Sequence, residues 1–183
     1  MLDTDIRQIL LKNLHLIPSM RKVSYVEEWF ISRKVIADVV GITSECLTGF
    51  EIKSDGDSLT RLANQIVSYD KVCRFNYIVV SDKFKNTIEN HIPSHWGIIY
   101  VTHDGIEILK EAKDHDITIK SLFWVLWRAE MVECMKQHKL KGYSKLRMSQ
   151  ITAVIIKELD AEIVEQYVYH TLLQRNSWKL QKH

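Results

Sequence analysis

The stretch VIADVVGITSECLTGFEIKSDGD, residues 35–57, decides the fold that the sequence predicts. It contains two runs, 35–42 and 46–53, that are rich in the β-branched and aromatic residues typical of β-strands. Only a few residues, with Thr43 and Ser44 among them, separate the two runs, and Gly41 lies at the end of the first; such a short connection favours an antiparallel hairpin. We therefore expect the two runs to pair in a sheet.

The segments around this hairpin predict an α/β domain with a mixed sheet flanked by helices. Helices are expected over 4–16, directly after a capping Asp57 or Ser58, and over 82–92, where Pro93 ends the helix. Strands are expected over 75–81 and 95–102, and an edge strand follows. Beyond residue 118 the pattern is only helical, over 121–140, 148–159 and 160–176, with Asp160 as a cap. The sequence thus predicts one domain over 1–115, a linker within 110–120, and a small all-helical, basic part over 120–183.

Composition narrows the class of protein. The chain has 183 residues, 46% of them hydrophobic, and a net charge of +2, which is ordinary for a globular protein with a real core. Its longest strongly apolar run, 122–127, is far shorter than the roughly 20 residues that span a bilayer, so no membrane partner is expected. Cys46, Cys73 and Cys134 form no paired motif, which favours reduced core thiols in a cytoplasmic protein.

Residues 38, 51 and 53 could carry chemistry together. In a strand over 46–53, Glu51 and Lys53 share the face opposite to Phe50 and Ile52. Asp38 lies inside an otherwise apolar strand, where a carboxylate is costly unless it is paired or binds a metal. In a hairpin the two carboxylates can approach each other, and a hard cation such as Mg²⁺ or Mn²⁺ would relieve their repulsion. By itself, however, a Glu-x-Lys pattern is equally typical of the solvent face of an amphipathic strand.

The helix after the hairpin carries a polar row. Arg61, Gln65 and Tyr69 recur every four residues, so they lie along one side of a helix. A guanidinium, an amide and a phenol in a row suit contact with a phosphate backbone. The alternative is a solvent-facing row in which Tyr69 is half buried. Asp55 and Asp57 in the SDGD turn are interpreted as turn and cap residues rather than as further metal ligands.

The order Asp38, Glu51-Ile52-Lys53 and Gln65-xxx-Tyr69 resembles the PD-(D/E)XK nuclease superfamily, in particular its RecB-type branch with a QxxxY element. It is similar to a group of bacterial and phage nuclease-like proteins in which EIKSDxDxLxRLxxQxxxY precedes a proline and a Trp-Gly strand. The likeness covers roughly residues 20–102. It implies a restriction-endonuclease-like fold and hydrolysis of phosphodiester bonds in DNA, and it leaves RNA open as a second substrate.

The resemblance also implies roles for single residues. Asp38 and Glu51 would bind Mg²⁺ or Mn²⁺ together with the main-chain carbonyl of Ile52, and Lys53 would be the catalytic lysine. Gln65 and Tyr69 would position the nucleic acid. The family's additional acidic ligand from the first helix has no counterpart among residues 4–16, so Glu27 or Glu28 would fill that place, or it stays empty. Ala37 replaces the proline of the family's name.

The charge pattern and the missing acid leave other functions open. Five cations between residues 136 and 147 have no acid among them, and we expect Lys141, Lys145 and Arg147 to add salt-dependent affinity for DNA, although a solvated helix end explains them equally well. The first alternative to a nuclease is a catalytically inactive binding module for DNA or protein on the same fold. The second is a structural or adaptor protein. The sequence leaves a homodimer open.

Overall fold

A computed structural model describes residues 1–20 and 24–175, and this part of the chain contains one mixed sheet of six strands in the order β1-β2-β3-β4-β5-β6. The β1–β2, β2–β3 and β5–β6 pairs are antiparallel, whereas β3–β4 and β4–β5 are parallel. The strands are Ser24–Phe30 (β1), Ile36–Ile42 (β2), Leu47–Lys53 (β3), Phe75–Val80 (β4), Gly97–Thr102 (β5) and Gly105–Lys110 (β6). The predicted mixed sheet and its antiparallel hairpin over 35–53 are confirmed.

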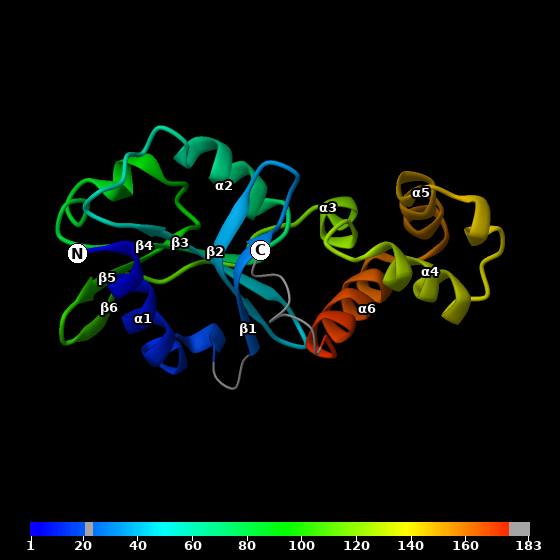
Figure 1. Cartoon of the computed structure of the whole chain (residues 1–183), viewed down its shortest axis with the longest axis horizontal. Helices are drawn as coiled ribbons and strands as arrows, with labels where there is room; N and C mark the ends of the chain where they lie inside the picture. The colour runs from blue at the N-terminus through cyan, green and yellow to red at the C-terminus, as the bar shows by residue number, and fades with distance from the viewer. Residues whose placement is uncertain (21–23, 176–183) are drawn as a thin grey trace.

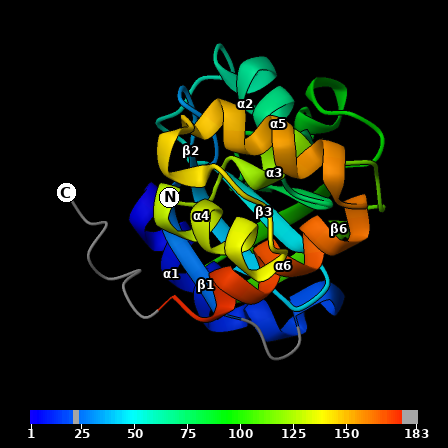
Figure 2. The same cartoon turned by 90° about the vertical axis from the view of Figure 1, so that its right-hand side faces the viewer.

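Helices cover both faces of the sheet. Helix α1 lies on one face and α2 on the other, and the later helices gather beyond one end of the sheet (Figure 1, Figure 2). The α-helices are Asp3–Asn13 (α1), Leu62–Asp70 (α2), Ile119–Phe123 (α3), Arg128–Gln137 (α4), Met148–Glu158 (α5) and Ala161–Leu173 (α6). Short 3-10 helices are Leu14–Leu16 (η1), Pro18–Met20 (η2), Ile88–His91 (η3) and Tyr143–Lys145 (η4).

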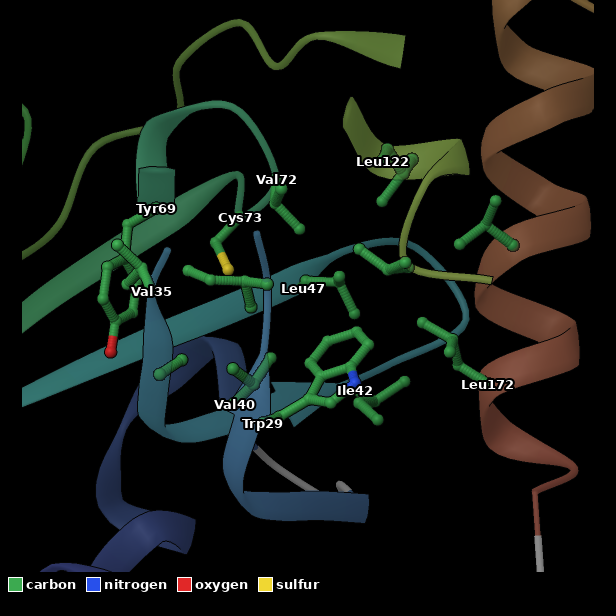
Figure 3. Packing of buried hydrophobic residues seen from close by; sticks show 14 of the residues in the cluster. Trp29, Val35, Val40, Ile42, Leu47, Tyr69, Val72, Cys73, Leu122 and Leu172 are labelled. Atoms are coloured by element: carbon green, nitrogen blue, oxygen red, sulfur yellow. The ribbon is translucent and has the colours of Figure 1, made fainter. Parts of the chain in front are cut away.

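Side chains on the two faces of β3 have different roles, one face in the core and the other at the candidate site. Phe50 and Ile52 pack with the buried side chains of α1, in the hydrophobic cluster on that face. Leu47, on the opposite face, belongs to a cluster that includes Trp29 and continues to Leu172 of α6 (Figure 3). Because side chains alternate along a strand, Glu51 and Lys53 point toward α2 rather than α1.

Two predicted helices are wrong. Residues 82–87 form turns and only η3 follows; Phe84 and Ile88 are the buried core contacts of this segment, with Ile92 partly buried beside them, and so few contacts do not hold a longer helix. The helix predicted over 121–140 is broken into α3 and α4. Trp127 has an extended backbone, and its N–H donates to Oε2 of Glu130 at 2.7 Å, so α4 starts afresh at Arg128.

The predicted caps also differ. Helix α2 begins at Leu62 rather than directly after Asp57 or Ser58, and Asp57 instead accepts hydrogen bonds from the main-chain N–H and the hydroxyl of Ser54, at 2.8 and 2.6 Å. Asp57 therefore closes the SDGD turn and does not cap the helix. Asp160 occupies the N-cap position of α6, as predicted, but its side chain makes no capping hydrogen bond.

The cysteines behave as expected. Cys46, Cys73 and Cys134 are free and buried, which confirms their prediction as core thiols. In the described parts of the chain, 1–20 and 24–175, no helix combines the length and the apolar character needed to cross a membrane.

Candidate active site

Asp38 and Glu51 are cross-strand neighbours. Val39 pairs with Phe50 in the antiparallel register of β2 and β3, so the next step along both strands sets Asp38 opposite Glu51. Oδ2 of Asp38 also accepts the main-chain N–H of Ile52 at 2.8 Å. The structure thus brings together the two carboxylates that the sequence singles out.

Glu51 is a buried carboxylate with half of its hydrogen-bonding capacity unused. Its side chain is 1% exposed, and Nζ of Lys53 donates to Oε1 at 2.6 Å. Oε2 is buried and has no hydrogen-bond partner in the structure. Burial, and secondly the charge of Asp38, raise the pKa of Glu51 to about 7, against the opposing effect of Lys53. An oxygen that is buried, unpartnered and close to a second carboxylate suits a bound cation.

Arg7 of α1 holds Asp38 from the other side. The guanidinium donates to the main-chain carbonyl of Asp38 at 2.7 Å and to its Oδ1 at 3.3 Å. Burial raises the pKa of Asp38, while the amide of Ile52 and the charge of Arg7 oppose that rise. Sequence reasoning missed Arg7, because nothing local to the first helix shows which strand it will cross. An arginine on the side of the helix that also carries Leu10 and Leu14 was the only available signal.

Lys53 and Gln65 complete a closed network. Oε1 of Gln65 accepts from Nζ of Lys53 at 3.1 Å, and its amide nitrogen donates to Oε1 of Glu51. Gln65 therefore belongs to the site, but in this structure it contacts the carboxylate and the ammonium directly. The network fixes the Lys53 ammonium, 5% exposed, against the Glu51 carboxylate.

Tyr69 does not line a nucleic-acid surface. Its side chain is fully buried, its hydroxyl accepts the N–H of Asp38 at 3.1 Å, and it donates to the carbonyl of Phe50 at 3.1 Å. Burial raises the pKa of Tyr69 well above its ordinary value. The ring fits because β3 has Gly49 below it, where an added Cβ would stand 2.4 Å from Cδ1 of Tyr69. The prediction that Tyr69 contacts nucleic acid is wrong; Tyr69 joins β2 to β3 beside Asp38.

The two candidate acids of β1 lie on the same groove as Asp38. Glu27 pairs with Val39 and Trp29 with Ala37, so Glu28 occupies the position across from Asp38. Glu28 has φ 51°, a left-handed conformation that is uncommon outside glycine and concentrates at functional sites. Both glutamates line a groove of about 1110 Å³ together with Asp38. The structure therefore keeps both residues close to the site, with Glu28 in the facing register position.

The basic residues predicted to contact nucleic acid lie in two separate places. Arg61 is exposed at the start of α2 and lines the same groove as Asp38 and Gln65. Lys141, Lys145 and Arg147 are exposed in the segment between α4 and α5, at the far end of the molecule from α1 and β6, and they do not line this groove (Figure 1).

A second polar cluster lies at the end of α2. Asp70 accepts from Nε1 of Trp96 at 2.8 Å, and Nε2 of His95 lies 3.1 Å from the same carboxylate oxygen. Nε2 of His115 lies 3.2 Å from the Asp70 carbonyl, and the ligand-type atoms of the three residues lie within 4.8 Å of one another. Such a group could hold a transition-metal ion. Its carboxylate oxygen also accepts from Asn76, so the cluster is hydrogen-bonded without an ion and fastens the linker to α2.

Comparisons with known proteins give one family and one fold neighbour. The model of the family described as "Bacteriophage P4 protein cII" matches residues 3–182. A solved structure, described as "SPO1766 protein of unknown function" from Silicibacter pomeroyi, is similar with a TM-score of 0.51 at 18% identity, over 77% of this chain and 98% of that one. At that identity the likeness shows the fold alone. No curated protein matches the chain.

Proposed function

The chain belongs to the family described as "Bacteriophage P4 protein cII", and we propose, from the site itself, that it is a metal-dependent nuclease that hydrolyses phosphodiester bonds of DNA. One observation carries the proposal. A buried glutamate oxygen without a hydrogen-bond partner lies beside a second carboxylate and a lysine, at the edge of an open groove. The superfamily resemblance of these residues, stated above from the sequence, points to the same chemistry.

The residues fit a hard divalent cation. Asp38, Glu51 and the carbonyl of Ile52 would hold Mg²⁺ or Mn²⁺, and Glu28, or Glu27 beside it, would add a further oxygen ligand from β1. When bound, the ion would lower the pKa of a coordinated water and offset charge on the phosphate.

The chain's own side chains prepare this arrangement. Arg7 and the Ile52 amide hold the Asp38 carboxylate in place through the hydrogen bonds described above. Lys53 lies against the Glu51 carboxylate and would face the position where negative charge grows on a reacting phosphate. Gln65 binds both partners of that ion pair, so it restricts the lysine to one orientation.

The experiment compares Asp38→Asn and Lys53→Met with the parent protein. Labelled single-stranded, duplex and branched DNA, and RNA, are incubated with each protein in Mg²⁺, Mn²⁺ or EDTA. We expect both changes to lower metal-dependent cleavage by at least about 100-fold, since even changes to groups around metal ligands cost 10- to 100-fold. Circular dichroism checks the fold, and Asp104→Asn, in an exposed turn, serves as the matched control. Cleavage that persists in both variants, or in EDTA, contradicts the proposal.

A binding module without catalysis is the second candidate. The closed contacts among Lys53, Glu51 and Gln65 favour it, because they satisfy most of the polar groups with no ion present. Calorimetric titration with Mn²⁺ separates the two. A nuclease site should bind Mn²⁺ in a way that Glu51→Gln abolishes, whereas a module without catalysis should show no such binding.

A further inference from the structure

A second groove continues from the one that holds the carboxylates. It has a volume of about 640 Å³ and runs between the β1–β2 connection, the end of α2, and α3. Its walls meet where the hydroxyls of Ser32 and Ser68 lie 3.4 Å apart. The two grooves share four lining residues, Phe30, Lys34, Ser68 and Lys71. A ligand can therefore pass from one groove to the other along a single path.

The charge along this path is uneven. The first groove is lined by acids and cations together, three acids (Glu27, Glu28 and Asp38) and three cations (Lys34, Arg61 and Lys71). The second has no acid, and its lining includes four exposed cations, Arg33, Lys34, Lys71 and Lys120. Within residues 1–20 and 24–175, none of these four forms an ion pair. Elsewhere on the surface, Lys110 pairs with Glu89 and Arg74 pairs with Glu165. Unpaired cations that line one groove provide binding positions for phosphates.

Aromatic rings stand among these cations. Phe30, at the junction of the two grooves, is 62% exposed, which is unusual for a phenylalanine. Trp124 lines the second groove, and the guanidinium of Arg33 lies 5.5 Å from its ring centroid. Trp124 is half-buried, whereas Phe30 presents an accessible ring. Cations beside such rings bind single strands, because phosphates pair with the cations while unstacked bases lie against the rings. In a duplex the faces of the bases are already stacked on each other.

We propose that this continuous path, which we call the basic groove (Phe30, Arg33, Lys34, Lys71, Lys120 and Trp124), binds single-stranded nucleic acid and leads it to Asp38. The inference rests on the proposed nuclease function for its biological purpose, but binding itself needs neither metal nor cleavage. Glu51 is only 1% exposed, so the candidate site is recessed. A flexible single-stranded nucleic acid can bend toward a recessed site more readily than a stiff duplex.

The test measures binding without cleavage. Fluorescence anisotropy in EDTA compares a labelled 16-nucleotide oligothymidylate with a duplex hairpin, using the full chain. We expect tighter binding of the single strand. The double change Lys34→Ser with Lys71→Ser, and the single change Phe30→Ser, should each weaken it by about 10-fold or more, because the first removes two cations that contact phosphates and the second removes a ring on which a base stacks. Removing two phosphate contacts should also lower the slope of log affinity against log salt by about 1.4.

Matched controls lie outside the basic groove. Lys12→Ser changes an exposed lysine of α1 that lines neither groove, and Leu109→Ser changes an exposed apolar residue of β6, 39% exposed; both should bind like the parent protein. Lys145→Ser, at the end of η4, separately tests the basic residues between α4 and α5. Equal or tighter binding of the duplex overturns the proposal, as does a loss that follows Lys145→Ser but not the groove variants. If single-strand binding holds while Asp38→Asn leaves cleavage unchanged, the groove stands and the nuclease assignment fails.

Discussion

The buried carboxyl of Glu51 should make the protein less stable as the pH rises toward neutrality. The pKa of this group is about 7 in the folded chain against 4.5 for an ordinary glutamate. Between these values the native state binds more protons than the unfolded state, so the free energy of unfolding falls with increasing pH. A difference of about 2.5 pKa units corresponds to about 3.4 kcal/mol in total, of which about 2.5 kcal/mol falls between pH 5 and pH 8.

The substitution Glu51→Gln removes this titration and keeps the shape of the side chain. Urea unfolding in EDTA, followed by circular dichroism at pH 5, 6, 7 and 8, measures the difference between the two proteins. The parent protein should lose about 2.5 kcal/mol more than the variant over this range, which corresponds to roughly 5–10 °C in Tm for a chain of this size. The readout is the slope with pH, because the absolute stability of the variant also includes its altered contact with Lys53.

Glu45→Gln, in the exposed β2–β3 connection, is the control and should follow the parent profile. Parallel profiles for the parent protein and Glu51→Gln, within about 0.5 kcal/mol across the range, would show that burial does not raise the pKa of Glu51 and would refute the reasoning. If the reasoning holds, Mn²⁺ added at pH 8 should raise the stability of the parent protein but not that of Glu51→Gln, since a ligand that binds only the native state stabilises it.

Three further changes test the architecture around the site. Tyr69→Phe removes a buried hydroxyl that bonds both β2 and β3, and should cost about 1–3 kcal/mol in urea unfolding while single-strand binding in EDTA is retained. Gly49→Ala places a methyl group 2.4 Å from the ring of Tyr69, so thermal melting should show a loss of about 1–3 kcal/mol or more from overpacking. His115→Ala releases the linker from Asp70, and faster amide exchange over 111–118 should follow, with α1 unchanged.

Local patterns in the sequence predicted much of the sheet and the centre of the site. Two β-rich runs joined by a short connection favoured a close hairpin, which the structure confirms, and strand alternation placed Glu51 and Lys53 on one face. Asp38 drew attention because a lone carboxylate in an apolar strand is costly. Each of these inferences uses neighbours within about twenty residues, which is the range over which periodicity and turn chemistry act.

Contacts between distant segments were decided only by the tertiary structure. Arg7 reaches Asp38 because α1 packs on the sheet against β3, β5 and β6, and Tyr69 is buried rather than exposed because Gly49 leaves room for its ring. The break at Trp127 depends on how α4 packs, and the basic groove exists because α3 lies beside the β1–β2 connection. Periodicity in a sequence indicates which face of an element is buried, but it does not identify the element that covers that face, so these features required the folded chain.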